Sequence, residues 1–220
     1  MANYLSFEKQ YDNLSTEQRK ILKKIPFIES IDGWLLLIEA VTLYNIASKI
    51  DSKGPIVCEI GVWKGKSSYI LATAMKEKGE TLYSIDPFNG DGDEPSIDTY
   101  QQKISKLNIS LLENFKKTMA GYKLLEFIQI IPETSEKAFK NFPENKIDLL
   151  FIDGNHNYES VKKDYDIWTP LVPNGGVIVL HDVEANHVDG PKRIFNEKLL
   201  NSSSWKDAHI VGEMGVATKR

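Results

Sequence analysis

The sequence has almost no cysteine and no long apolar segment, and each absence excludes a class of protein. Its 220 residues include one cysteine, Cys58, which excludes an intrachain disulfide and a multi-cysteine metal site. The longest apolar stretches, residues 35–38 and 177–180, are far shorter than the roughly 20 residues of a transmembrane helix. The N-terminal segment contains no continuous apolar run of the kind that marks a signal peptide. We therefore expect a cytoplasmic protein that does not associate with a membrane.

The chain also lacks an excess of positive charge. Its 27 Lys and Arg residues and 31 Asp and Glu residues give a formal net charge of -4 at pH 7. A general nucleic-acid binder usually carries a basic face, so we expect no nucleic-acid partner. Hydrophobic residues make up 41% and charged residues 26%, which is typical of a globular protein with a buried core.

From about Gly54 onward, short runs of β-branched residues alternate with longer segments of helical periodicity. This alternation is typical of a mostly parallel sheet with connecting helices on both faces. Glycines at positions 212 and 215 predict that the last two strands form an antiparallel hairpin. The predicted strands are residues 56–60, 81–85, 127–131, 147–152, 177–180, 208–211 and 215–218. The predicted helices are residues 67–78, 97–119 (in one or two pieces), 134–141, 158–171 and 192–200.

The first fifty residues follow a different pattern. Residues 16–25 and 34–50 each show helical spacing of apolar positions, and Pro26 separates them. We expect residues 1–53 to form a helical extension packed on the same domain as residues 54–220. Such an extension fits a substrate lid or a dimer contact, so the sequence leaves a homo-oligomer open.

Each predicted parallel strand ends in a group of polar residues. In open α/β sheets, ligands bind beyond the carboxyl ends of the strands, so five such groups predict one shared ligand site. The groups are Glu59-Ile60-Gly61, Asp86-Pro87, Glu133-Thr134-Ser135, Asp153-Gly154-Asn155-His156 and His181-Asp182.

The first of these loops is rich in glycine. Gly61 and Gly65 allow a tight turn and a close approach of a ligand to the backbone. A phosphate-binding P-loop needs four residues between its glycines, and here there are three. The dinucleotide fingerprint also fails, because Trp63 stands where its second glycine would be.

Three segments, in order and spacing, resemble motifs of one enzyme family. Glu59 to Ser67 is similar to motif I of class I S-adenosylmethionine-dependent methyltransferases. Residues 148–159 resemble the D-G-x-H-x-Y segment of a small-molecule branch that includes macrocin-type sugar O-methyltransferases, and residues 171–182 resemble the H-D element of that branch. The resemblance covers roughly residues 55–200. It implies a Rossmann-like, seven-stranded sheet with an antiparallel C-terminal strand and S-adenosylmethionine as cofactor.

The resemblance also implies roles for residues of the cofactor site. Glu59 would hold the first loop or the amino group of the cofactor, Asp86 would accept hydrogen bonds from the ribose hydroxyls, and Asp153 would lie near the sulfonium. The implied cofactor-binding residues are Glu59, Gly61, Gly65, Ser67, Asp86, Ser135 and Asp153, with Ser135 beside the adenine.

The same branch often uses a divalent cation, which implies a metal site at Asp153 and Asp182. These carboxylates end adjacent predicted strands and would share one hard ion such as Mg²⁺ through oxygen. The third ligand stays open among Glu133, Glu184 and His181. A histidine beside a ligand often supports it from behind, and this is the expected role of His181.

His156 is the candidate general base, because it lies three residues after Asp153 and matches the base position of the related sugar methyltransferases. An imidazole of ordinary pKa takes up a proton near neutral pH. The alternative is that His156 only caps the following helix or supports the metal carboxylates. The acids Asp91, Asp93 and Glu94 lie in a predicted loop that fits a mobile substrate lid or a solvated turn.

Together these features predict an enzyme that transfers the methyl group of S-adenosylmethionine to a hydroxyl of a sugar or natural product, with help from a divalent cation. Two alternatives stay open. One is an N-methyltransferase of a small metabolite, and the other is an NAD-dependent oxidoreductase on the same fold.

Overall fold

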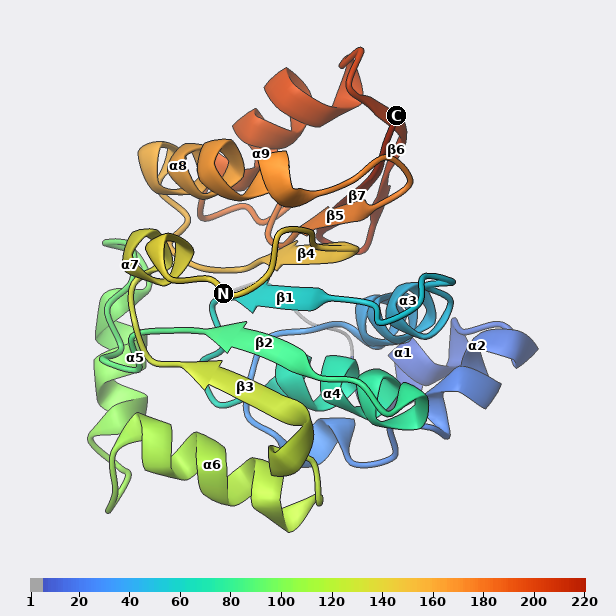
Figure 1. Ribbon diagram of the computed structural model, residues 1–220. Coiled ribbons are helices and arrows are strands. Elements are labelled where there is room, and N and C mark those ends of the chain that lie inside the picture. The colour runs from blue at the N-terminus through green and yellow to red at the C-terminus, as the bar shows by residue number, and fades with distance from the viewer. Residues whose placement is uncertain (1–5) are drawn as a thin grey trace.

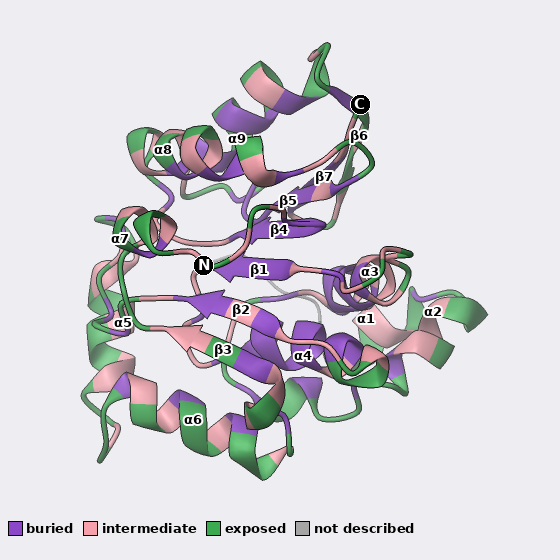
Figure 2. Cartoon of the chain, viewed as in Figure 1, coloured by how far each residue is buried: buried purple, intermediate pink, exposed green. Residues whose placement is uncertain are grey.

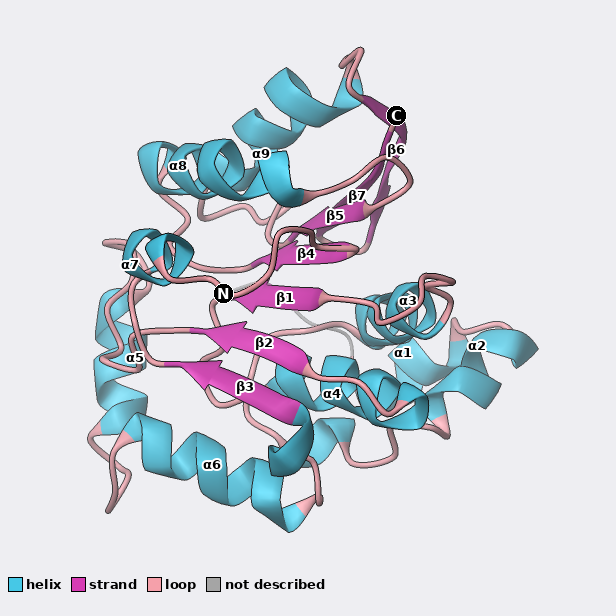
Figure 3. Cartoon of the chain, in the orientation of Figure 1, coloured by secondary structure: helices cyan, strands magenta, loops and turns pink. Residues whose placement is uncertain are grey.

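The computed structural model describes residues 6–220 and contains a seven-stranded sheet with the strand order β3-β2-β1-β4-β5-β7-β6 (Figures 1 and 3). The first five strands are parallel, and β7 pairs antiparallel with both β5 and β6. This is the predicted Rossmann-like fold with its antiparallel C-terminal strand. The strands are β1 (Val57–Ile60), β2 (Leu82–Ile85), β3 (Ile128–Ile131), β4 (Leu149–Ile152), β5 (Val177–Leu180), β6 (Trp205–Val211) and β7 (Met214–Lys219).

Helices cover both faces of the sheet. The helices α3, α4 and α6 pack on one face, and α7, α8 and α9 pack on the other (Figure 1). The helices after β1 are α4 (Lys66–Lys78), α5 (Ile97–Ile104), α6 (Leu111–Gly121), α7 (Ser135–Lys140), α8 (Tyr158–Trp168) and α9 (Gly190–Ile194), which continues as a π-helix over Phe195–Leu200. The N-terminal extension forms α1 (Phe7–Asp12), α2 (Thr16–Leu22) and α3 (Leu37–Ser48).

The two faces of the sheet belong to two separate hydrophobic cores. Successive side chains of a strand point to opposite faces, so Val57 joins the core under α3, α4 and α6 while Cys58 joins the core under α7, α8 and α9. Figure 2 shows that β4 is buried along its whole length, as expected of a central parallel strand covered on both faces.

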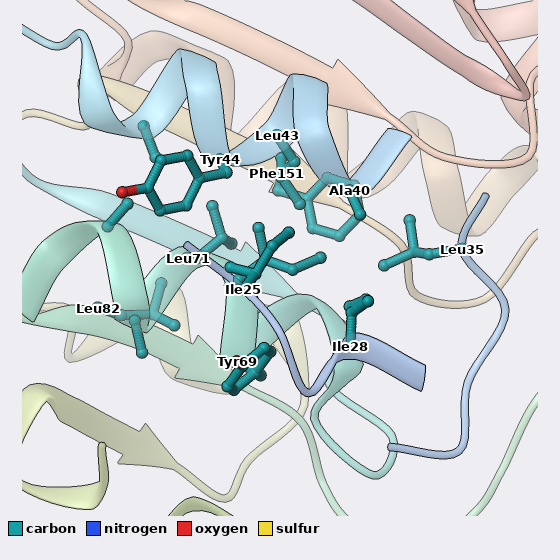
Figure 4. Close-up of a cluster of buried hydrophobic side chains, with 14 of the residues drawn as sticks. Ile25, Ile28, Leu35, Ala40, Leu43, Tyr44, Tyr69, Leu71, Leu82 and Phe151 are labelled. Carbon is teal, nitrogen blue, oxygen red and sulfur yellow. The ribbon is translucent and has the colours of Figure 1, made fainter. Parts of the chain in front are cut away.

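The N-terminal extension is built into the first core. Ile25 and Leu43 are fully buried and lie in one cluster with Leu71 of α4 and Phe151 of β4 (Figure 4). The Tyr44 hydroxyl also donates a hydrogen bond of 2.6 Å to Glu77 at the far end of α4. The extension therefore shares its core with the sheet.

Among the described residues, no helix combines the length and the apolar character needed to cross a membrane.

The structure decides one open point of the helix prediction and adds one helix. The segment over residues 97–119, expected as one or two pieces, is two helices, because Ser110 starts a new one with a capping box to Glu113. The described part of the extension also contains α1, which the apolar spacing did not predict, since none of its residues is buried.

Candidate active site

The register of the parallel strands brings four predicted site segments into one row. The backbone N–H of Gly61 donates to the carbonyl of Ile85, and that of Asp153 donates to Ile60. In the same way Asp86 continues from β2 and His181 continues from β5. The loops after β1, β2, β4 and β5 therefore leave the sheet side by side at its carboxyl edge.

Glu59 is fully buried and lies under the first loop. Its carboxylate accepts hydrogen bonds from the hydroxyls of Ser67 (3.0 Å), Ser68 and Ser84 (2.6 Å). Burial raises the pKa of Glu59 to about 7, although the three hydroxyls act to lower it. Since the carboxylate is turned toward the start of α4, the geometry favours the first of its two expected roles, holding the loop.

Asp86 organises the same loop from the neighbouring strand. One of its carboxylate oxygens accepts from the backbone N–H groups of Val62 (2.8 Å) and Trp63 (3.1 Å), and the other accepts from Phe88 (2.6 Å). Burial raises the pKa of Asp86, and these three N–H groups oppose the shift. The side chain stays partly exposed, and a carboxylate has about four acceptor positions, so one is left for a ligand.

Two glycines shape this loop. Gly61 has φ +89°, and a Cβ there would lie 2.0 Å from the carbonyl oxygen of Asp153. Gly65 has φ +93°, and its Cβ would lie 2.8 Å from the ring of Phe115. The loop therefore fits against the β4 loop and α6 only because both positions lack a side chain.

Asp153, His156, His181 and Asp182 form a cluster beyond β4 and β5. His156 Nε2 lies 2.9 Å from Asp182 Oδ2 and 3.7 Å from Asp153 Oδ1. His181 Nδ1 lies 3.2 Å from Asp153 Oδ1 and 3.4 Å from Asp182 Oδ2. Each histidine thus turns one ring nitrogen toward the same two carboxylates.

The other ring nitrogen of each histidine faces a further buried carboxylate. His156 Nδ1 lies 2.5 Å from Asp93 Oδ2, and His181 Nε2 lies 3.4 Å from Glu39 Oε2. Glu39 belongs to α3, and its oxygens also accept from the backbone N–H groups of Leu36 and Glu213. Two carboxylate–histidine pairs therefore flank Asp153 and Asp182.

These contacts set the charge of the cluster. Burial acts to lower the pKa of His156 and of His181, but the surrounding carboxylates raise the pKa of both histidines well above the ordinary value. Burial acts to raise the pKa of Asp93, and its bond to His156 lowers that pKa to about 2. The pKa of Asp182 is likewise lowered by the two histidines against the effect of burial. The carboxylates thus favour the protonated form of both histidines, and the histidines favour the ionised form of Asp93 and Asp182.

The structure distinguishes the three candidates for a third metal ligand. Asp153, His181 and Asp182 offer ligand atoms that all lie within 4.8 Å of one another. Glu133 and Glu184 are both about half exposed and pair with the lysines of their own surface segments, Lys137 and Lys192. Among these candidates, His181 is the one that lies at the acid pair.

Two members of the cluster were not predicted from the sequence. A solvated turn is the wrong description for Asp93, which is 1% exposed and contacts His156, although its neighbours Asp91 and Glu94 are exposed. Glu39 carried one signal, since it is a single charged residue within the apolar helix over residues 37–48. Its partner, however, lies 142 residues away in the chain.

The other residues considered from the sequence lie outside the cluster. Ser135 starts α7 and accepts a hydrogen bond of 2.8 Å from the indole of Trp168. Ser67 lies in the first turn of α4 and contacts Glu59. His187 is exposed in the loop after β5, and His209 is exposed on β6.

Three aromatic side chains border the cluster on the side of the N-terminal extension. Trp34, Trp63 and Tyr100 have ring centroids 4.9 to 5.9 Å apart, and the indole nitrogen of Trp63 is buried without a hydrogen-bond partner. Burial raises the pKa of Tyr100 to about 12; the charge of His156 acts to lower it, and the nearby carboxylates add to the rise. Trp63 therefore packs against the extension and α5.

The segment 32–34 is tied to this aromatic group by charge. Asp32 accepts from the ammonium groups of Lys64 (2.8 Å) and Lys103 (2.6 Å). Each lysine also lies over an indole ring, Lys64 over Trp63 and Lys103 over Trp34. The N-terminal extension thereby forms a wall of the site.

Comparison with known proteins identifies the family. Residues 58–183 match a family described as "Methyltransferase domain". The match covers more than half of the chain, so the chain belongs to the methyltransferase-domain family.

One curated relative and two solved structures illustrate the similarity. An uncharacterized protein of Acanthamoeba polyphaga mimivirus is 28% identical over 144 residues, which are 64% of this chain, and the chain spans 58% of that relative's length. The O-methyltransferase NovP has a TM-score of 0.65 at 18% identity, covering 83% of this chain and 80% of NovP. The O-methyltransferase TomG from Streptomyces achromogenes, solved with S-adenosylmethionine, has a TM-score of 0.62 at 16% identity, covering 98% and 99%. At these identities the structural similarity establishes the shared fold.

Proposed function

We propose that the chain transfers the methyl group of S-adenosylmethionine to a hydroxyl of a small molecule, such as a sugar or a natural product, with a divalent cation at Asp153 and Asp182. The observation that carries this proposal is the position of His156. Its imidazole is held by Asp93 on one side and faces Asp153 and Asp182 on the other, at the edge where the glycine loop also lies.

The cofactor side of the site is the loop after β1 together with Asp86. When bound, S-adenosylmethionine supplies an electrophilic methyl group, and the protein has to align the acceptor oxygen with it. Asp86 keeps an acceptor position for the ribose hydroxyls, and the missing side chain at Gly61 lets the loop after β1 pack directly on the backbone of Asp153. The solved structure of TomG with S-adenosylmethionine supports this choice of cofactor on the shared fold.

The acceptor side is the cluster of carboxylates and histidines. An aliphatic hydroxyl is a poor nucleophile, so a positioned base that removes its proton speeds the transfer. Asp93 fixes the orientation of His156 by holding Nδ1, which leaves Nε2 to accept a proton. A divalent cation at Asp153 and Asp182, for which the family resemblance suggests Mg²⁺, would offset the negative charge that keeps His156 protonated.

The acceptor itself would enter beside Trp34, Trp63 and Tyr100. These rings offer apolar faces next to the charged cluster, a combination that suits a sugar ring or an aromatic ring carrying a hydroxyl. We propose that the N-terminal extension acts here as a substrate lid, because Asp32 links it to the first loop and to α5.

Methyl transfer from isotope-labelled S-adenosylmethionine tests the proposal directly. The protein is incubated with a panel of sugars and phenols and with Mg²⁺ or Mn²⁺, and label in the acceptor is measured. We expect His156→Asn to bind S-adenosylhomocysteine as the unchanged protein does, but to transfer label at least about 100-fold more slowly. The exposed His187→Asn variant is the matched control and should transfer at the full rate. Equal rates for the two variants would exclude His156 as the base.

A further inference from the structure

The distances around the acid pair match those between ligands of one metal ion. Metal ions in proteins hold nitrogen and oxygen ligands at about 2.0 to 2.2 Å, which places neighbouring ligand atoms about 3 Å apart. His181 Nδ1 lies 3.2 Å from Asp153 Oδ1 and 3.4 Å from Asp182 Oδ2. The nitrogen therefore occupies a ligand position relative to both carboxylates.

His181 is oriented for this position from behind. Its Nε2 faces the carboxylate of Glu39, which is itself 1% exposed and fixed by the backbone N–H groups of Leu36 and Glu213. Metal-bound histidines almost always have a carboxylate or carbonyl on the second ring nitrogen, because it fixes the ring and raises its basicity. His181 therefore has the environment of a ligand as well as the distance.

A second observation points to the same space. His156 is more than nine-tenths buried, and its Nε2 lies 2.9 Å from Asp182 Oδ2 and 3.7 Å from Asp153 Oδ1 without forming a hydrogen bond to either. A buried polar atom without a hydrogen bond is costly, and it is common where an ion or a reacting group completes the site. His156 Nε2 and His181 Nδ1 therefore face the same two carboxylates from opposite elements, the loop after β4 and the end of β5.

The donor set decides which ions fit. Mg²⁺ is a hard ion that prefers oxygen ligands and keeps several waters, whereas an imidazole nitrogen suits first-row transition ions. We propose that His181 Nδ1 is the third protein ligand beside Asp153 and Asp182, and that the site therefore takes a first-row transition-metal dication in preference to Mg²⁺. This inference rests on the proposed cation-assisted function and replaces its Mg²⁺ with a different class of ion.

Metal binding measured without turnover tests the inference. The full chain is freed of metal, and Co²⁺ and Mg²⁺ are titrated separately and in competition. We expect Co²⁺ to bind at least about 100-fold more tightly than Mg²⁺, as the preference of imidazole for transition ions implies. Mn²⁺ is then bound for pulsed EPR, where coupling to ¹⁴N reports a histidine ligand. Equal affinity for Co²⁺ and Mg²⁺, no binding of either ion, or bound Mn²⁺ without ¹⁴N coupling would each overturn the inference.

Two variants identify the histidine that provides the nitrogen ligand. His181→Asp supplies three carboxylates, so we expect its preference for Co²⁺ over Mg²⁺ to fall by at least about tenfold and its ¹⁴N coupling to disappear. His156→Asn should keep the coupling, and His187→Asn controls for binding to a surface histidine. Coupling that persists in His181→Asp and is lost in His156→Asn would assign the ligand to His156 and contradict the inference. If His181→Asp does not fold, His181→Asn takes its place in the EPR comparison.

The failure of this inference can be told apart from the failure of the proposed function. Binding of S-adenosylhomocysteine is measured by calorimetry in the presence of a chelator, where no metal contributes. A protein that binds S-adenosylhomocysteine but shows no ¹⁴N coupling keeps the proposed cofactor and loses only the histidine ligand.

Discussion

The four carboxylates at the carboxyl edge of the sheet form two pairs with opposite surroundings. Glu59 and Asp86 are satisfied by neutral donors, which are three hydroxyls for Glu59 and three backbone N–H groups for Asp86. Asp153 and Asp182 instead face the ring nitrogens of His156 and His181. The first pair thus has neutral hydroxyl and backbone N–H partners, whereas the second pair has partners that gain or lose protons.

The two pairs therefore have different roles: the first pair fixes the loop conformation, and the second pair sets the charge of the site. The donors around Glu59 and Asp86 hold the loops after β1 and β2 in one conformation, with Trp63 (φ 52°) and Phe88 (φ 53°) in the left-handed region that most residues avoid. Around Asp153 and Asp182, removing a proton or adding a cation changes the charge of the whole cluster. We therefore expect changes at the first pair to affect cofactor binding and stability, and changes at the second to affect proton transfer and metal binding.

The largest effect on stability is expected at Gly61, where the loop after β1 packs against the backbone of Asp153. Gly61→Ala places a Cβ 2.0 Å from the carbonyl of Asp153 and forces a side chain into φ +89°. We expect a loss of about 4 kcal/mol in the free energy of unfolding, because the cost of the left-handed backbone adds to the clash. Gly79→Ala is the matched control, since Gly79 has φ +72° with nothing within 4 Å, and it should cost only about 1 kcal/mol. Denaturant titration measures both, and equal costs would contradict the close packing of the loops.

The pH dependence of stability tests the environment of Glu59. Its pKa is about 7 in the folded protein and 4.5 as the ordinary value, so the folded state favours the protonated carboxyl. This contribution to stability is complete below about pH 4.5 and is lost as the pH rises through 7, a change of about 3 kcal/mol. Glu59→Gln cannot titrate. The difference in unfolding free energy between the two proteins should therefore shift toward the variant by about that amount from pH 4.5 to 7.5. A constant difference would show that Glu59 is ionised throughout.

Asp86→Asn tests whether the first pair, Glu59 and Asp86, contributes to cofactor binding. The amide keeps one acceptor oxygen but loses the charge and the second oxygen, so we expect binding of S-adenosylhomocysteine to weaken by about 2 kcal/mol, roughly thirtyfold. Asp148→Asn is the matched control, because Asp148 accepts from the backbone N–H of Ile56 (2.8 Å) at the other end of the strands. The control should bind S-adenosylhomocysteine as the unchanged protein does. Equal weakening in both variants would mean that the effect comes from the fold.

The smallest effect on the cofactor is expected from Asp93→Asn. Asp93 is one of three carboxylates that raise the pKa of His156, so the variant should lower that pKa while leaving the affinity for S-adenosylhomocysteine unchanged. NMR titration of the imidazole in metal-free protein measures the first quantity, and calorimetry measures the second. An unchanged His156 titration would show that the Asp93 contact does not persist in solution.

Much of the fold could be predicted because the signals are local. Apolar runs such as residues 147–152 mark buried strands, and the polar residues after them mark the ligand edge of a parallel sheet. All seven predicted strands overlap the observed ones, and β6 begins three residues earlier than predicted, at Trp205. Apolar spacing left open whether residues 97–119 form one helix or two, and the capping residue Ser110 decides for two.

The candidate site was less accessible to sequence reasoning. Asp86 and Asp153 follow strands directly, and Asp182 follows one residue after β5, so the fold alone implies where they lie. Asp93 and Glu39 reach their histidines across 63 and 142 residues of chain, and no local pattern encodes such contacts. The partners that orient the histidines therefore became visible only in the structure.

The most direct test of the account is calorimetric titration of the full chain with S-adenosylhomocysteine in the presence of a chelator. A separate titration with NAD is run under the same conditions. The account predicts saturable binding of S-adenosylhomocysteine that Asp86→Asn weakens and Asp148→Asn does not, with no binding of NAD. Binding of NAD without binding of S-adenosylhomocysteine would contradict it and identify the glycine loop as a dinucleotide site.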